Sequence, residues 1–329
     1  MSLFENKYKI IEKLGSGTGG FVFKAKHILK NELCAIKIEI KKKESLLCRE
    51  AQFYRYLETM GNTLSGNSEN MYPKVRYVGS TNNYNYLVMD LLDKSLNDII
   101  NTRGGFTIKT ILLISIQMIQ LLKTIHTNYI IHRDIKPSNF MFGYKDGVFK
   151  LYLIDFGLCV YGKNGEIYNV KRPKDFIGNL KYASYISLLT KNPNYRDDIV
   201  SVIYIMIEMY IGTLPWSDID LNEKNLPILM IKKNPKLVYD FCKFSKLPNN
   251  MLKVVDYVLF SGRRNLNYNY ILMMLRNELY RLNYTEDYQY DWLSYISPIT
   301  RKNMYKYIFF VSFNLKYFII NSSIPNADI

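Results

Sequence analysis

The sequence has few cysteines and histidines, and their spacing argues against two classes of site. The cysteines stand far apart and include no Cys-x-x-Cys pair: Cys34, Cys48, Cys159 and Cys242. We therefore expect reduced thiols in an intracellular protein and no disulfide framework. The three histidines, at positions 27, 126 and 132, have no spacing that would complete a zinc site with these cysteines.

The sequence also lacks a long uninterrupted apolar run. The nearest is residues 307–320, which Asn314 and Lys316 interrupt. A spanning helix needs about 18 or more apolar residues, so we predict no membrane span and a packed terminal element there. Charged residues such as Glu5 and Lys7 break the first dozen positions, so we expect no secretory signal. We expect a monomer in the cytoplasm, the nucleus or both, and in the host cytoplasm if the chain is viral.

Acidic residues are outnumbered, with 29 Asp and Glu against 44 Lys and Arg, for a net charge of +15. A basic protein attracts nucleic acid, acidic membrane surfaces, or acidic and phosphorylated proteins. Alternatively, the frequent Asn, Lys, Ile and Tyr reflect an AT-rich genome, such as that of a large DNA virus or a protozoan parasite. The positive charge would then only form a solvated basic face and would indicate no binding partner. No aromatic platform is interleaved with the basic residues, so we expect no stable nucleic-acid binding.

The order of the predicted elements indicates an α+β fold with two lobes. Strands are predicted at 8–15, 20–26, 32–40, 75–78 and 85–89, with one main helix at 44–60 and a polar loop at 61–70. Helices are predicted at 107–128, 197–212, 236–242, 249–260 and 269–282. We therefore predict a small β-rich lobe over residues 1–92, a larger and mostly helical lobe over 93–282, and a C-terminal extension over 283–329 without an assigned role.

A glycine-rich turn lies between the first two predicted strands. Its sequence fits G-x-G-x-x-G-x-V, with Gly15, Ser16, Gly17, Gly20 and Val22 at the defining positions. Glycine lets backbone amides approach phosphates closely. A dinucleotide-binding unit would need a helix after the glycines, whereas here a strand continues. Alone, the pattern fits a plain hairpin equally well.

Lys37 ends the Ala-Ile-Lys of the third predicted strand. Lysine is rarely buried without a partner, and Glu50 on the following predicted helix is well placed to pair with it. Together they would hold the α- and β-phosphates of ATP. Alternatively, Lys37 is a surface residue of an edge strand.

The most specific segment is HRDIKPSN at residues 132–139, just after the long apolar helix. We predict that Asp134 accepts the proton of a substrate hydroxyl and that Lys136 neutralises charge on the γ-phosphate. Asn139 would brace Asp134 and ligate a metal ion.

A second acidic residue, Asp155, begins Asp-Phe-Gly sixteen residues beyond Asn139. Magnesium prefers oxygen ligands, so Asp155 and Asn139 are the predicted metal ligands for Mg²⁺ that bridges the β- and γ-phosphates of ATP. The spacing of these segments predicts phosphoryl transfer from Mg-ATP.

These motifs resemble the eukaryotic protein kinase superfamily, and four other segments resemble its casein kinase 1 group, to which the vaccinia-related, poxvirus-type kinases are related. The four segments are MDLLDKSL at 89–96, GNLKYAS at 178–184, RDDIVS at 196–201 and LPW at 214–216. The resemblance covers about residues 8–282. It implies a Ser/Thr protein kinase with protein substrates, because Lys136 is typical of Ser/Thr kinases. Arg133, where the vaccinia-related branch commonly has Gly, favours the casein kinase 1 side.

The resemblance also implies roles for individual residues around the nucleotide. Asp90 and Leu92 would meet adenine through their backbones. Asp198 would hold the His-Arg-Asp backbone of the catalytic loop, residues 132–139. Four side chains would enclose the ring and guard the back of its pocket: Val22, Ala35, Met89 and Met141.

A basic pocket for acidic or phosphate-primed substrates is implied by the same resemblance. Arg133, Lys174 and Lys181 match parts of that pocket, and clustered cations bind phosphate well. A further lysine expected soon after Trp216 has no counterpart. Alternatively, these residues only order the activation segment, whose end the segment 178–184 resembles.

A pseudokinase that acts as a binding scaffold is the alternative to an active enzyme. Pseudokinases usually lack the strand lysine, the catalytic aspartate or the metal-binding aspartate, and this chain has Lys37, Asp134 and Asp155. We therefore favour the active enzyme.

Overall fold

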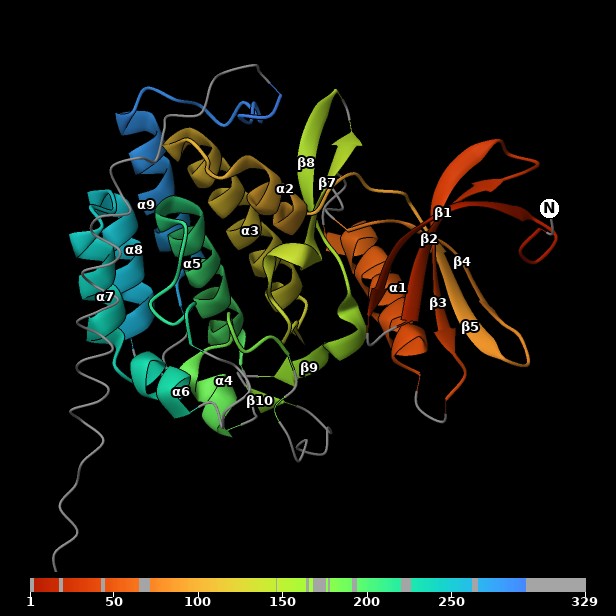
Figure 1. Cartoon of the computed structure of the whole chain (residues 1–329), viewed down its shortest axis with the longest axis horizontal. Helices are drawn as coiled ribbons and strands as arrows, with labels where there is room; N and C mark the ends of the chain where they lie inside the picture. The colour runs from red at the N-terminus through yellow and green to blue at the C-terminus, as the bar shows by residue number, and fades with distance from the viewer. Residues whose placement is uncertain are drawn as a thin grey trace, which may run out of the picture.

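The computed structural model describes residues 3–17, 20–42, 45–64, 72–145, 147–163, 166–167, 176, 178–190, 194–219, 226–261 and 266–293. Figure 1 shows a β-sheet with one long helix at one end of the molecule and a larger group of helices at the other. This arrangement confirms the predicted bilobal α+β fold.

The N-terminal lobe is built on a five-stranded antiparallel sheet in the order β1-β2-β3-β5-β4. The strands are β1 (Tyr8–Gly17), β2 (Gly20–His27), β3 (Glu32–Ile40), β4 (Val75–Ser80) and β5 (Tyr84–Met89). Side chains alternate between the two faces of a strand. One face therefore carries a small core around Ile36 and Val88, while Leu87 on the other face joins the main core with α1.

Helix α1 (Leu46–Leu64) lies against the sheet and carries Leu47, Tyr54 and Leu57 into the main core. The helix runs four residues past the predicted end at residue 60. Gly61 keeps a helical backbone, because glycine alone disfavours a helix by only about 1 kcal/mol relative to alanine. The predicted loop at 61–70 is therefore wrong over its first four residues, and its remainder lies outside the described residues.

The C-terminal lobe is mostly helical. Its helices are α2 (Leu96–Arg103), α3 (Ile108–Thr127), α4 (Tyr185–Thr190), α5 (Tyr195–Ile211), α6 (Leu226–Lys233), α7 (Pro235–Phe244), α8 (Asn249–Phe260) and α9 (Tyr268–Arg281). Its short strands are β6 (Ile130–Ile131), β7 (Phe140–Lys145), β8 (Val148–Leu153), β9 (Val160–Lys163) and β10 (Glu166–Ile167), and two 3₁₀ turns lie at η1 (Pro137–Asn139) and η2 (Phe156–Leu158). The residues predicted to act on a substrate lie in or beside these turns and short strands.

Helices α3 and α5 form the centre of this lobe. Thr107 caps the N-terminus of α3, and Asn194 and Asp197 form a capping box at α5, which ends at Gly212 with a left-handed φ of 92°. Helix α3 is long and apolar enough to span a membrane by length and composition, but most of it is buried inside the fold. The sequence predicted this helix at 107–128, but the run at 307–320 was named as the nearest to a membrane span, and that run lies outside the described residues.

The chain continues to pack on the C-terminal lobe after α9. The Tyr290 hydroxyl accepts a hydrogen bond from Gln117 at 2.7 Å and donates one to the Phe149 carbonyl at 3.1 Å. Asp291 accepts hydrogen bonds from the Thr107 backbone and side chain and so extends the cap of α3. The start of the predicted C-terminal extension therefore contacts the core of the lobe.

Candidate active site

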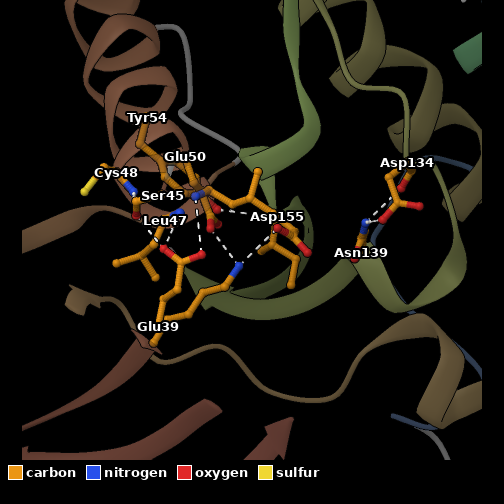
Figure 2. Close-up of polar contacts among 12 residues, drawn as sticks. Glu39, Ser45, Leu47, Cys48, Glu50, Tyr54, Asp134, Asn139 and Asp155 are labelled. Carbon is orange, nitrogen blue, oxygen red and sulfur yellow. Dashed lines mark hydrogen bonds and ion pairs between the residues drawn. The ribbon is translucent and has the colours of Figure 1, made fainter. Parts of the chain in front are cut away.

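The catalytic loop between β6 and β7 brings together Asp134, Lys136 and Asn139. Asp134 is only 5% exposed. Its Oδ2 accepts hydrogen bonds from Lys136 Nζ at 2.6 Å and Asn139 Nδ2 at 3.2 Å, and its carbonyl accepts one from Asn139 Nδ2 at 2.8 Å. Its Oδ1 is buried and has no hydrogen-bond partner among the described residues. Figure 2 shows Asp134 and Asn139 facing one another.

The backbone of this loop is held by Asp198 on α5. Asp198 Oδ2 accepts from the His132 amide at 2.7 Å, and Oδ1 accepts from the Arg133 amide at 3.0 Å. Arg133 has a left-handed φ of 70°, a conformation that costs a non-glycine residue roughly 1–3 kcal/mol. The two buried, charge-assisted hydrogen bonds offset this cost and fix the loop.

Lys37, Glu50 and Asp155 form one ionic cluster, which Figure 2 shows beside α1. Lys37 Nζ lies 2.6 Å from Glu50 Oε2 and 3.0 Å from Asp155 Oδ1. Burial disfavours the charged ammonium, but the two carboxylates more than offset this and raise the pKa of Lys37. Burial disfavours the charged form of Asp155 as well and would raise its pKa, but Lys37 lowers this pKa below the usual range. Lys37 and Asp155 are therefore both charged at neutral pH.

The packing of Phe156 holds the neighbouring Asp155 in this position. Its ring is fully buried and packs against Tyr54 of α1, with ring centroids 4.9 Å apart, and against His132 at 5.3 Å. The Asp155 amide donates to the Tyr54 hydroxyl at 3.3 Å, and its own backbone is left-handed with φ 65°. The ionic cluster is thus joined through one aromatic ring to the catalytic loop.

The register of the N-terminal sheet places the predicted nucleotide-contacting side chains on one face. Val22 pairs with Lys37 across β2 and β3, and Ala35 pairs with Met89 across β3 and β5. Directly opposed residues project to the same side of a sheet, as do residues two apart on one strand. Val22, Ala35 and Met89 therefore share the face of Lys37.

The glycine-rich turn joins β1 to β2, with Gly15, Ser16 and Gly17 at the end of β1. Gly20 begins β2 with φ 111°, and a Cβ added there would lie 2.0 Å from the Ile38 carbonyl oxygen. Only glycine fits this position, because β3 passes so close to the backbone. The two residues at the tip of the turn lie outside the described residues.

Residues 90–95 link the two lobes and contain the predicted adenine contacts. The Asp90 carboxylate accepts from Arg76 Nε at 2.8 Å and from the Lys74 amide at 3.2 Å, which fixes the start of the link. Within the described residues, the Asp90 carbonyl and the Leu92 amide have no backbone hydrogen-bond partner. These two groups are thus available for hydrogen bonds to the adenine ring of a nucleotide. Met141 follows the link on β7 and forms a β-bridge with Ser95.

A comparison with families of known proteins agrees with this geometry. Residues 8–262, about three quarters of the chain, match the family model described as protein kinase domain. The chain belongs to the protein kinase family. The match supports the eukaryotic protein kinase superfamily, and a protein kinase domain generally uses ATP and Mg²⁺.

The residues of this kinase fit magnesium. The described residues include no cluster of three or more His, Cys, Asp or Glu that could enclose a metal by itself. This suits Mg²⁺, which one or two protein oxygens and the substrate phosphates usually bind. The Asp155 side chain is 39% exposed, and the hydrogen bonds of the Asn139 side chain to other described residues use its nitrogen. The Asp155 carboxylate and the Asn139 amide oxygen would therefore hold the ion.

The three residues of the predicted anion pocket are placed differently from one another. Arg133 Nε donates to the Leu158 carbonyl at 2.6 Å, and Lys181 forms an ion pair with Glu208 of α5. Lys174 lies outside the described residues. The charge of Lys181 is already compensated within the kinase, so the anion pocket stays a prediction.

Glu39 and Lys232 are among the buried charged residues that the sequence did not predict. Glu39 lies on β3 and contacts the start of α1, while Lys232 on α6 donates to three carbonyls of the segment 178–184. The only sequence signal for Glu39 is its spacing of two from Lys37 on one strand face. Nothing local marks Lys232, because its partners are about fifty residues away.

Proposed function

We propose that this protein kinase transfers the γ-phosphate of Mg-ATP to serine and threonine hydroxyls of proteins. The observation that carries the proposal is the state of Asp134. Lys136 and Asn139 hold Oδ2, whereas Oδ1 is buried without a partner among the described residues. An oriented carboxylate with one free oxygen is what a general base for a hydroxyl requires.

The remaining residues have complementary roles in the proposed reaction. Lys37, oriented by Glu50, would hold the α- and β-phosphates, while Asp155 and Asn139 would hold Mg²⁺. The substrate oxygen would attack the γ-phosphorus and the bond to the β-phosphate oxygen would break. ADP would leave and the hydroxyl proton would pass to Asp134. Lys136, 2.6 Å from Asp134, would neutralise charge on the transferred group.

The choice of serine and threonine, and the likeness to casein kinase 1, rest on sequence. Lys136 lies two residues after Asp134, as is typical of Ser/Thr kinases, and the segments at 89–96, 178–184 and 196–201 resemble the casein kinase 1 group. The net charge of +15 is compatible with acidic or phosphate-primed protein substrates. We propose this preference on the basis of the overall charge of the kinase and not of a defined anion pocket.

A degenerate peptide array with radiolabelled ATP would test the proposed function. We expect Mg²⁺-dependent phosphate on serine and threonine peptides, abolished by chelation of the metal, with acidic or primed peptides preferred. Label confined to tyrosine would refute the Ser/Thr assignment. Nucleotide binding without any transfer would support a pseudokinase scaffold instead.

A further inference from the structure

Glu39 is a buried carboxylate that the proposed reaction does not use. It is 1% exposed and lies on β3, two residues beyond Lys37 and on the same face of the strand. Burying a carboxylate is costly unless it is paired and hydrogen-bonded. Its partners therefore indicate what it does.

The partners of Glu39 lie at the start of α1, as Figure 2 shows. Its two oxygens accept from the Leu46 and Leu47 amides, each at 3.4 Å, and one also accepts from the Ser45 hydroxyl. Ser45 Oγ in turn accepts from the Cys48 amide at 3.1 Å. A helix begins with four N–H groups that have no partner within the helix, and Glu39 and Ser45 satisfy three of them.

Glu39 is charged in this position. Burial would raise its pKa, but the Ser45 hydroxyl, the Leu47 amide and Lys42 together lower it below the usual range. An anion at a helix N-terminus is also favoured by the helix dipole. The contact between β3 and α1 is thus charge-assisted, and Lys42 Nζ at 3.3 Å supports it from the solvent side.

We infer that Glu39 is a positioning residue, which fixes α1 against β3 so that Glu50 meets Lys37. Lys37 and Glu39 are about 7 Å apart along the strand, given a rise of about 3.3 Å per residue. Leu47 and Glu50 are three residues apart on α1, a rise of about 5 Å on one face of the helix. Two neighbouring positions on β3 therefore hold two neighbouring positions on α1.

The second attachment to β3 matters because a single ion pair with this strand would leave the register between α1 and β3 to the packing of apolar side chains. With its N-terminus held, α1 can neither rotate Glu50 away nor slide along the sheet without breaking buried hydrogen bonds. Glu50 is thus kept in place by residues of this chain. The consequence for catalysis rests on the proposed function, whereas the placement of α1 does not.

The variants Glu39→Ala and Glu39→Gln test the inference, with Glu12→Gln as a control on an exposed glutamate of the same sheet. We expect Glu39→Ala to speed amide exchange at residues 46–48 at least tenfold, to raise KM for ATP and to lower kcat. KM for the peptide should stay unchanged. Glu39→Gln keeps one acceptor oxygen and should recover part of each effect, while Glu12→Gln should match the wild type.

A double-mutant cycle separates positioning from a general loss of stability. If Glu39 acts through Glu50, Glu39→Ala should reduce phosphotransfer in the wild type but add nothing in a Glu50→Gln background. An equal reduction in both backgrounds, or unchanged α1 exchange in folded Glu39→Gln, would overturn the inference. Amide exchange and binding of a fluorescent ATP analogue remain informative even if the wild type transfers no phosphate, so failure of the proposed function is recognised separately.

Discussion

At the scale of single residues, the hydrogen bonds of the catalytic loop determine the protonation state of the His132 ring. Its Nε2 donates to the Ile154 carbonyl at 3.1 Å and its Nδ1 accepts from the Asp134 amide at 3.4 Å. This pair of bonds requires the neutral ring. Burial lowers the pKa of His132 below 6.5, although the nearby carboxylates Asp198, Asp134 and Asp155 oppose the shift. The loop geometry is therefore coupled to an uncharged histidine.

We predict a pH-dependent stability that His132 causes. Below pH 6.5 the unfolded chain binds a proton at this ring that the folded chain does not, so stability falls as the pH is lowered. The contribution is up to about 1.4 kcal/mol per pH unit until the folded pKa is reached. Denaturant unfolding of the wild type and His132→Gln at pH 5.0–7.5 would measure it. Parallel stability curves for the two proteins would contradict the prediction.

At the scale of elements, α6 is tied to the segment 178–184 by one buried lysine. Lys232 is 4% exposed, and its ammonium lies 4.6 Å from the ring centre of Trp216. It donates to the carbonyls of Leu180, Lys181 and Ala183 at 2.8, 3.1 and 2.6 Å. Burial lowers the pKa of Lys232 well below its usual value. The lysine thus supplies hydrogen-bond donors to three carbonyls of one segment, of which the Lys181 carbonyl also accepts from the Trp216 indole N–H.

We predict that Lys232→Met impairs the use of protein substrates. The Leu180 and Ala183 carbonyls would lose their donor, at a cost of about 1–3 kcal/mol for each group left buried, whereas the Lys181 carbonyl keeps the Trp216 indole N–H at 2.8 Å. The segment 178–184, which resembles the end of a kinase activation segment, would then lose its shape. Steady-state kinetics should show a KM for peptide raised at least fivefold with KM for ATP unchanged. The neighbouring exposed Lys233→Met is the matched control, and equal kinetics for both variants would refute the prediction.

Elements with strong local signals could be predicted from the sequence. The ranges of α3, α5, α8 and α9 agree with the predicted ones within two residues, because long apolar periodicity and caps such as Thr107 and Gly212 define them. Helices α2, α4 and α6 have six to eight residues, too few for periodicity to reveal them.

The candidate site could be predicted where spacing along the chain sufficed. Asp134, Lys136 and Asn139 lie within six residues, and the structure brings them together. The partnership of Glu39 with α1 and that of Lys232 with the segment 178–184 depend on tertiary contacts, which no local pattern reports. Lys181 likewise needed the structure, because its pairing with Glu208 joins residues 27 positions apart.

At the scale of the whole molecule, the packed C-terminal lobe does not end with α9. The Tyr290 ring is buried and stacks on Trp292, with centroids 4.7 Å apart, and both rings pack edge-on against Phe142 of β7. Lys109 on α3 pairs with Asp287 at 2.7 Å. Residues 284–293 therefore stabilise the lobe that carries the catalytic loop.

We predict that the kinase truncated after residue 282 is less stable than the kinase truncated after residue 293. Loss of one buried aromatic side chain typically costs about 3–5 kcal/mol, and loss of Asp291 also removes the extended cap of α3. Thermal unfolding of the two truncated proteins beside the full chain would measure the difference. Equal melting temperatures for the two truncations would show that residues 284–293 contribute nothing.

The lobes meet in a chain of contacts that runs from Lys37 through Asp155 and Phe156 to the catalytic loop. The account depends most on Asp134 as the proton acceptor at the end of this chain. Single-turnover phosphotransfer by Asp134→Asn, measured beside its affinity for ATP, tests this claim most directly. The account predicts a rate at least 100-fold lower, since general base catalysis contributes about 10²–10⁴-fold, with ATP affinity within a factor of two of the wild type. A wild-type rate of transfer in the variant would contradict it.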